Sequence, residues 1–309
     1  MDLTVRNNII AGNKIEINRQ NDMNMIFKEP SVRNGRIWRI DHGNIAEVND
    51  DMAVEEPLEI RLSFNDGSEQ QIRTVAVTMR TPGADDKLAI GFLYTEGIIT
   101  SPEDIVSVSS PFSLCSRNAG NIIEIELRTG LLPAISTLER NFYVTSSCGI
   151  CGKASIDAVR TKLPQKEGIP LDSPVIELKG LLSLPARVRQ AQEVFESTGG
   201  LHASALFDRD LQLLWLMEDV GRHNALDKAI GATLLNQQYF GKASLLLLSG
   251  RASFELIQKA AMAGIIVVAA IGAPSSLAVS MAEDCGITLI GFMKEHKFNI
   301  YTHPNRIKI

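Results

Sequence analysis

The sequence has few cysteines, no long apolar run and no excess of positive charge. Four cysteines in 309 residues are too few for a disulfide framework in a chain of this length. The longest apolar run, Gly264 to Ala273, is about half of the roughly 20 residues that a membrane-spanning helix needs. The formal net charge of -5 argues against a general nucleic-acid binder, which neutralises phosphates with many Lys and Arg side chains. Because no secretory signal precedes residue 20 either, we expect a cytoplasmic protein without membrane or nucleic-acid partners.

The rest of the composition is that of a globular protein, with 45% hydrophobic and 22% charged residues. The length suits one large domain or two ordinary ones. We interpret residues 1–32 as a polar extension, residues 33–143 as a mixed, strand-rich domain and residues 144–309 as an α/β domain.

The first half has the period of half-buried strands. Apolar residues alternate over Leu58–Phe64, and the alternation resumes over Val75–Met79 after a hairpin turn at residues 65–67. Asp85 is placed to cap a helix that runs towards Gly97, and residues 123–127 alternate again. These patterns predict a mixed region with antiparallel strands.

The second half alternates short apolar strands with helices. The expected strands are Leu245–Leu248, Ile265–Ala270 and Thr288–Phe292, and the expected helices are Arg222–Leu235, Phe254–Ala263 and Ser275–Cys285. This succession predicts βαβ units in a sheet that helices cover on both faces. Ligands of such folds bind in loops at the carboxyl ends of the strands, here Glu218–Asn224, Ser249–Ser253 and Gly272–Ser276.

Two cysteines stand three positions apart in Ser146-Ser147-Cys148-Gly149-Ile150-Cys151-Gly152-Lys153. A helix that begins near Cys151 would favour the thiolate of Cys148, and Lys153 would add to that effect. The spacing suits redox or sulfur chemistry, but it also suits half of a zinc site or inert burial. We predict no metal here, since no second C-x-x-C pair is present.

Two adjacent glycines precede an expected strand in Thr198-Gly199-Gly200-Leu201-His202. Glycines without a side chain let backbone amides approach an anion closely. The same pair also serves as an ordinary helix C-cap and turn. Taken alone, the motif favours the cap, and Gly199, Gly200 and His202 stay candidates for ligand binding.

Polar residues crowd the start of the helix expected at residue 222. Asp219, Arg222, His223 and Asn224 supply donors and acceptors for a purine, a ribose or a phosphate. Acidic residues at a helix start are often caps, and a single His is often a satisfied core residue. Because so many polar groups gather at one end of the helix, we favour a role in binding.

A further candidate follows the strand at residues 245–248. Ser249-Gly250-Arg251-Ala252-Ser253 has the strand, small-residue, helix order that places a phosphate at a helix N-terminus, where Arg251 would clamp it. The segment lacks the Lys of a P-loop and the glycines of a dinucleotide fingerprint.

Taken together, these segments resemble the formate dehydrogenase accessory sulfurtransferase family, FdhD. The resemblance covers nearly everything after about residue 55, in order. The matching segments are RTPGADDKLAIGFLYTEGII (80–99), SSCGICGK (146–153), TGGLHASAL (198–206), EDVGRHNALDKAIG (218–231), SGRASFELIQKAAMAGI (249–265), APSSLAV (273–279) and LIGFMKEHKFNIYTHPNRI (289–307).

The resemblance implies a three-layer α/β/α sandwich similar to cytidine deaminases, with a smaller strand-rich N-terminal part, and a homodimer. It implies a sulfurtransferase in which a cysteine desulfurase passes sulfur to Cys148 as a persulfide, assisted by Cys151. The sulfur then goes to bis-molybdopterin guanine dinucleotide, the molybdenum cofactor that formate dehydrogenase requires.

The resemblance also implies a cofactor-contacting segment near the C-terminus. It consists of Phe292, Met293, Lys294, Glu295, His296 and Lys297. We further infer that the three loops at Gly199–His202, Asp219–Asn224 and Ser249–Arg251 suit the guanine nucleotide ends of the cofactor.

Three other functions have less support from the sequence. A zinc nucleotide deaminase needs H-x-E followed by P-C-x-x-C, and neither pattern is present. Thioredoxin-like chemistry needs an early βαβ context that C-x-x-C lacks here. A chaperone that only binds the cofactor fits the same loops, so the sequence leaves this alternative open.

Overall fold

The computed structural model describes residues 14–16, 31–65, 67–111, 120–131, 176–236 and 238–308. None of the helices in these ranges is long and apolar enough to span a bilayer.

The larger sheet has six strands in the order β10-β9-β11-β12-β13-β14. They are β9 (His202–Phe207), β10 (Leu213–Asp219), β11 (Leu245–Leu248), β12 (Val267–Ala270), β13 (Thr288–Gly291) and β14 (Asn299–Ile300). Strands β11, β12 and β13 are parallel, and α7 (Phe254–Met262) and α8 (Ser276–Asp284) connect them. The βαβ units predicted from the alternation are therefore confirmed.

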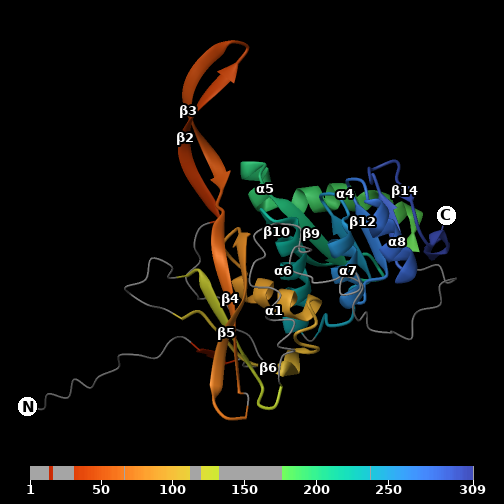
Figure 1. Cartoon of the computed structure of the whole chain (residues 1–309). Coiled ribbons are helices and arrows are strands. Elements are labelled where there is room, and N and C mark those ends of the chain that lie inside the picture. The colour runs from red at the N-terminus through yellow and green to blue at the C-terminus, as the bar shows by residue number, and fades with distance from the viewer. Residues whose placement is uncertain are drawn as a thin grey trace, which may run out of the picture.

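Helices cover both faces of this sheet (Figure 1). One face packs on α6 (Arg222–Leu235), α7 and α8, and the other on α4 (Leu178–Ala191). Every residue of β11, β12 and β13 is buried, as expected of parallel strands between two helical layers. The expected α/β/α sandwich is present. The likeness to cytidine deaminases stays a prediction.

The smaller sheet has the order β1-β6-β7-β4-β5. Its strands are β1 (Lys14–Glu16), β4 (Glu56–Asn65), β5 (Gln70–Arg80), β6 (Ile105–Ser109) and β7 (Ile122–Leu127). The predicted hairpin is the antiparallel pair β4–β5, but β4 and β7 are parallel, so the sheet is mixed. Short elements complete the fold: a 3-10 turn at Pro102–Asp104, β8 (Ile176–Glu177), another 3-10 turn at Pro304–Arg306, and β15 (Ile307–Lys308) paired with β8.

Helix α1 (Asp85–Thr95) starts differently from the prediction. Its N-cap is Ala84, which has a positive φ of 56°, and Asp85 is the first helical residue. The carboxylate of Asp85 instead accepts two hydrogen bonds from the buried guanidinium of Arg80, at 3.0 and 2.9 Å. Pairing a buried charge outweighs capping, because an unpaired guanidinium in the interior is costly.

Strands β2 (Val32–Asp41) and β3 (Asn44–Ala53) form a hairpin of their own. It stands away from the rest of the molecule as a continuation of the β4–β5 ribbon, and its base lies next to α5 (Glu193–Thr198) (Figure 1). The first residue of β2 lies at the end of the expected polar extension.

The two expected domains share one hydrophobic core. The core cluster contains residues of β4, β5 and α1 together with residues of α6, α7 and β11. The predicted boundary near residue 143 lies outside the described residues, so the division at that point stays a prediction. The joint is tight, since Gly91 of α1 lies against the backbone of Asp227, and Gly231 of α6 lies against the backbone of Lys87.

A buried polar network lies at the same contact between α1 and α6 and extends to α7. Lys259 of α7 donates to Asp227 of α6 at 2.9 Å and to Thr95 of α1 at 2.8 Å. Thr95 in turn donates to Asp227 at 2.9 Å. Because each charge has its partner, the network fixes how α1, α6 and α7 meet.

We expect Gly231→Ala to lower the free energy of unfolding by about 3 kcal/mol, because a Cβ at this position overlaps the carbonyl of Lys87 and forces the helices apart. Urea unfolding followed by circular dichroism measures the change. Gly180→Ala in α4 is the matched control, since its Cβ meets only the flexible end of Leu211. A loss no larger than that of the control would show that α1 and α6 do not need this close approach.

Candidate functional site

The topology brings the predicted loops to one edge of the large sheet. The parallel strands β11, β12 and β13 all end at this edge, so the loops beginning at Ser249, Ile271 and Phe292 lie along it. Strands β9 and β10 form a hairpin next to β11, and their antiparallel pairing places His202 opposite Asp219 at the same edge. The predicted alignment of these loops at equivalent strand ends is confirmed.

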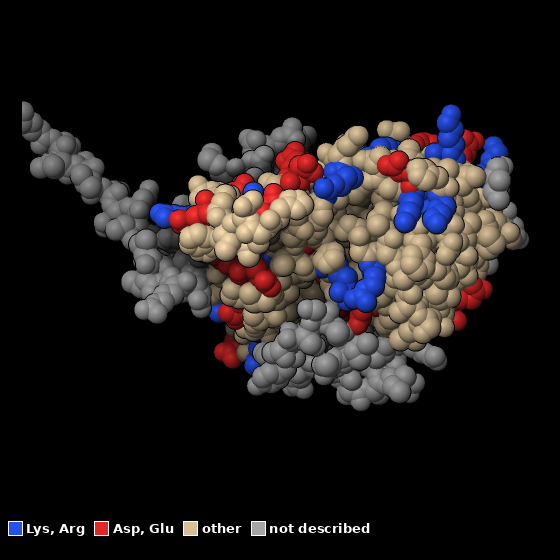
Figure 2. All heavy atoms as spheres, turned by 90° about the horizontal axis from the view of Figure 1, so that it is seen from above, with Lys and Arg blue, Asp and Glu red and all other residues tan. Residues whose placement is uncertain are grey.

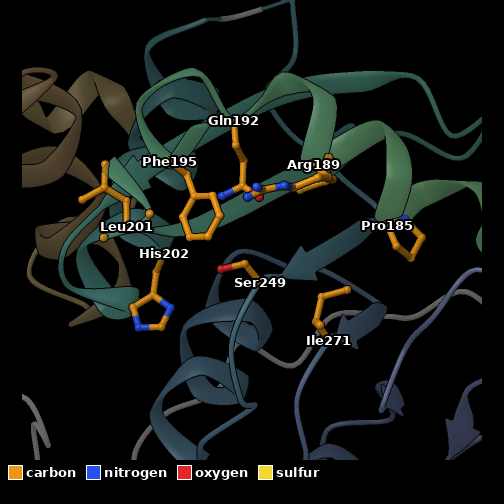
Figure 3. Close-up of a pocket in the computed structure, with 11 residues that line it drawn as sticks. Pro185, Arg189, Gln192, Phe195, Leu201, His202, Ser249 and Ile271 are labelled. Atoms are coloured by element: carbon orange, nitrogen blue, oxygen red, sulfur yellow. The ribbon is translucent and has the colours of Figure 1, made fainter. Parts of the chain in front are cut away.

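A cavity of about 540 Å³ opens at this edge, between α4, α5 and the starts of the loops. Its size is within the range of pockets for small molecules and cofactors. It is lined by Pro185, Val188, Arg189, Gln192, Phe195, Gly199, Gly200, Leu201, His202, Ser249 and Ile271 (Figure 3). Four predicted site residues, Gly199, Gly200, His202 and Ser249, are among them.

The glycine pair serves as a helix cap and as cavity wall. Gly199 ends α5 with a φ of 65°, and its N–H donates to the carbonyl of Phe195 at 2.7 Å. A left-handed conformation of this kind favours glycine. The cap alternative is therefore confirmed, while the position of both glycines on the cavity keeps them available to a ligand.

Two hydrogen bonds between β9 and the residue that follows β11 hold the cavity floor. Ser249 Oγ accepts from the Ala203 N–H at 2.8 Å, and the Ser249 N–H donates to the Ala203 carbonyl at 3.0 Å. The ring of His202 lies close to Gly250, where a Cβ would come within 3.2 Å of Nδ1. Arg251, in contrast, is exposed.

His202 is a neutral side chain in the cavity wall. Burial, and then the charges of Arg222 and His223, lower the pKa of His202. At neutral pH it therefore offers one N–H donor and one acceptor rather than a positive charge. Arg222, at the start of α6, has a buried Nε without a hydrogen-bond partner among the described residues.

His223 faces α7 instead of the cavity. Its Nε2 lies 3.5 Å from Glu255 and 3.4 Å from the hydroxyl of Ser253. Burial alone would raise the pKa of Glu255, but hydrogen bonds from His223 and Ser253 outweigh it and hold this pKa below its usual value. The pair ties the start of α6 to the start of α7.

Asp219 and Asn224 are committed to contacts within the protein. Asp219 is fully buried and accepts from Lys228 at 2.7 Å and from the backbone N–H of Thr81. Burial raises the pKa of Asp219 despite that lysine. Asn224 donates to the carbonyl of Met79 at 2.7 Å. The structure gives both residues the role of a clamp between α6 and the end of β5, and their predicted role in ligand binding gains no support from it.

The candidate segment near the C-terminus, residues 292–297, contains one buried residue and five exposed ones. Met293 is 1% exposed and packs in the core on the α4 side of the sheet, so burial corrects its prediction as a cofactor contact. Phe292 is 47% exposed with a φ of 53°. Lys294, Glu295, His296 and Lys297 form an exposed turn closed by a hydrogen bond from the Lys294 N–H to the Lys297 carbonyl.

Seven of the residues that line the cavity are not among the predicted site residues, and three of these seven carry polar or aromatic groups. Gln192 is 6% exposed, and its Nε2 has no partner among the described residues, so it is a buried donor that faces the cavity (Figure 3). The guanidinium of Arg189 lies 4.3 Å from the ring centre of Phe195. Nothing in the run RVRQAQEVF marks these residues, because it reads as an ordinary amphipathic helix.

Charge on this side of the molecule is local. Seen from the end that carries the hairpin, Lys and Arg atoms form separate groups on the body rather than a continuous basic face (Figure 2). Such groups suit a discrete anionic ligand, whereas a nucleic acid needs an extended basic surface.

Cys148 and Cys151 lie outside the described residues, so their predicted roles stay predictions. Cys285, at the end of α8, is half-buried, and burial raises the pKa of its thiol to about 11. This cysteine is therefore a poor nucleophile at neutral pH. The described residues hold no group of three or more His, Cys, Asp or Glu side chains arranged to bind a metal ion.

A sequence model of the FdhD/NarQ family matches residues 53–308. The chain belongs to this family. Relatives named sulfur carrier protein FdhD include those of Mycolicibacterium paratuberculosis, 47% identical over 88% of this chain and 97% of the relative, and Streptomyces coelicolor, 44% identical over 89% and 95%. A crystal structure described as a formate dehydrogenase accessory protein from Desulfotalea psychrophila is 22% identical, with a TM-score of 0.66 over 90% of this chain and all of that one.

In this member of the FdhD/NarQ family, the wall of the cavity depends on one carboxylate. Glu218 of β10 accepts hydrogen bonds from the N–H groups of Val194 and Phe195 in the first turn of α5, at 3.0 and 2.9 Å. A carboxylate at this position satisfies amides that a helix leaves unpaired and also favours the helix dipole.

We expect Glu218→Ala to speed hydrogen exchange at the amides of Val194 and Phe195 by about fivefold, the factor that corresponds to about 1 kcal/mol for a lost cap. Exchange measured by mass spectrometry on peptides spanning α5 tests this. Glu193→Ala, an exposed residue of the same helix, is the control. Equal exchange in the two variants would mean that Glu218 does not hold the wall.

Proposed function

We propose that this protein is a sulfurtransferase that carries sulfur on Cys148 and delivers it to the molybdenum cofactor of a formate dehydrogenase. The observation that supports the proposal best is the group of relatives, 40–47% identical along most of their length, that are named sulfur carrier protein. The thiol pair Cys148 and Cys151 lies within the matched family range. Cys285, the one cysteine among the described residues, has a thiol that is too weakly acidic for the task.

The chemistry of loading needs no added oxidant. The Cys148 thiolate attacks the terminal sulfur of a persulfide on a cysteine desulfurase. A new S–S bond forms on Cys148, the S–S bond of the donor breaks, and the donor cysteine leaves as a thiolate. A neutral thiol attacks poorly, so the reaction requires the thiolate of Cys148.

Release needs two electrons, and Cys151 is placed in the sequence to supply them. Its thiolate attacks the inner sulfur of the Cys148 persulfide, which forms a Cys148–Cys151 disulfide and expels hydrosulfide. Hydrosulfide then replaces an oxo ligand of the molybdenum, and that oxygen leaves as water after it takes the proton of the hydrosulfide and one proton from solvent. A cellular dithiol reduces the disulfide for the next cycle.

The cavity at the sheet edge would hold one guanine nucleotide end of the cofactor. Phe195 and the guanidinium of Arg189 offer flat surfaces for a purine, and the unpaired amide of Gln192 offers a hydrogen-bond donor. Arg222 and Arg251, which lie at the same edge of the sheet, would face the phosphates. At about 540 Å³ the cavity suits one nucleotide and not the whole cofactor.

The same cavity supports one competing function, a chaperone that holds the cofactor without transferring sulfur. The variant Cys148→Ala distinguishes the two functions. If the protein is a chaperone, this variant still activates formate dehydrogenase. If the protein is a sulfur carrier, this variant does not activate it.

Incubation with a cysteine desulfurase and cysteine should add about 32 Da, the mass of one sulfur atom, to Cys148. Intact mass spectrometry with and without reductant measures the adduct. Cys285→Ala should keep the adduct and Cys148→Ala should lose it, while Cys151→Ser should accumulate it because release is blocked. An adduct that persists in Cys148→Ala would contradict the carrier assignment.

Arg222→Ala and Gln192→Leu should each weaken the binding of guanosine diphosphate about tenfold, because Gln192 supplies a hydrogen-bond donor inside the cavity and Arg222 supplies positive charge at the same edge of the sheet. Isothermal calorimetry measures the affinities. Arg209→Ala, an exposed arginine in the turn between β9 and β10 at the opposite edge of the sheet, should bind like the parent protein. Unchanged affinity in both site variants would contradict the binding of the nucleotide in this cavity.

A further inference from the structure

A second, smaller cavity lies at the opposite edge of the large sheet and has a volume of about 200 Å³. Ala243 and Ile265, which precede β11 and β12, form part of its wall, so it lies at the amino ends of these strands. Residues near the end of α6 form another part, and α1 packs alongside α6 (Figure 1). We call this space the amino-edge cavity. Sulfur transfer at the other edge does not use it.

The wall of the amino-edge cavity is apolar. Apart from Tyr94 and Thr233, the described residues that line it are Leu, Ile, Phe, Ala and Gly, and none of them is charged. Because an unpaired charge is costly to bury, a ligand of this cavity is neutral and mostly apolar. A cavity of about 150 Å³ lined by Leu, Ile and Phe holds one benzene molecule. The amino-edge cavity therefore has room for a single six-membered ring with a few further atoms.

Small residues in the wall leave this space open. Gly241 has a φ of 73°, which favours glycine, and Ala243 and Ala263 lie nearby in the lining. A void of this kind lacks the contacts that a close-packed interior has, so a ligand that fills it restores them. Phe240 also lines the cavity, yet it is 46% exposed. A ring bound beside Phe240 would cover part of that exposed surface.

Two hydroxyl groups give the apolar wall a polar feature. The hydroxyl of Tyr94 has no hydrogen-bond partner among the residues that the structure describes. Burial raises the pKa of Tyr94, so this hydroxyl stays a donor at neutral pH. The hydroxyl of Thr233 donates to the carbonyl of Ala229 at 3.0 Å, which leaves it the capacity to accept. One free donor and one free acceptor match a hydroxyl group, which both accepts and donates.

We propose that the amino-edge cavity is a binding site for a neutral aromatic alcohol of the size of phenol. The ring packs among the apolar side chains beside Phe240, and its hydroxyl accepts a hydrogen bond from Tyr94. A ligand of about seven non-hydrogen atoms reaches a dissociation constant of about 0.1 to 1 mM. The inference goes beyond the sulfur-carrier function and does not depend on it.

Phenol itself is the probe, titrated into the whole protein by isothermal calorimetry. Ala263→Leu fills the cavity with a larger side chain and should weaken phenol binding at least about tenfold. Ala46→Leu, the same change at an exposed position of β3, should bind like the parent protein. Circular dichroism checks that both variants are folded. Equal phenol affinity in these two variants overturns the proposal.

A milder variant tests the polar contact without changing the packing. Tyr94→Phe keeps the ring and removes only the hydroxyl, so phenol should bind about fivefold more weakly, the factor for one neutral hydrogen bond. Toluene has no hydroxyl and should bind Tyr94→Phe and the parent protein equally. Phenol affinity that does not change in Tyr94→Phe, or toluene affinity that falls as much as that of phenol, refutes the assignment to an alcohol.

Methyl NMR of isoleucine-labelled protein locates the ligand. The methyl signals of Ile230 and Ile265, which line the cavity, should shift on addition of phenol, and the signal of the exposed Ile40 should not. Guanosine diphosphate should leave these shifts unchanged, since the proposed nucleotide site lies at the other edge of the sheet. Displacement of phenol by guanosine diphosphate, or shifts that do not include Ile230 and Ile265, would place phenol elsewhere and refute the site.

Discussion

Parallel pairing of three short strands is the constraint on which the rest of the structure depends. Strands β11, β12 and β13 have four residues each, and all twelve residues are buried between two layers of helices. Because the strands run in one direction, all three end at the same edge, where β11 and β12 lead through loops into α7 and α8 and β13 leads into the exposed turn at residues 294–297. Segments that are far apart in the sequence therefore meet at this edge, and the cavity lies where they meet.

Charged residues divide into two kinds according to burial. Lys228 with Asp219, and Lys259 with Asp227, are buried pairs whose hydrogen bonds join α6 to β5, α1 and α7. Their cost of desolvation is offset only by good geometry, so they specify how the two sheets sit together. Gln192 is different, because it lines the cavity and its buried Nε2 has no hydrogen-bond partner among the described residues. A ligand that supplies the missing partners gains what the folded protein leaves unsatisfied.

The hairpin and the cavity place two kinds of surface on one molecule. The cavity combines apolar walls with a few polar groups and suits a small ligand with a flat ring, whereas the hairpin presents large apolar side chains to solvent. The base of the hairpin contacts α5, where Ala53 lies near Gly200. The base of the hairpin therefore lies directly against the wall of the cavity.

The sequence by itself determined the order and type of the main elements, because hydrophobic periodicity is a local property. The predicted strand Leu245–Leu248 and helix Arg222–Leu235 coincide with β11 and α6. It also placed Gly199, Gly200, His202 and Ser249 at the site, since glycines and polar residues after strands are local signals. Only the tertiary structure decided that Asp219 and Asn224 clamp β5, that Met293 faces the core, and that Gln192 and Phe195 line the cavity. Each of those facts depends on which distant segment packs against the residue, and burial of a polar or apolar side chain is settled by that neighbour and not by the local sequence.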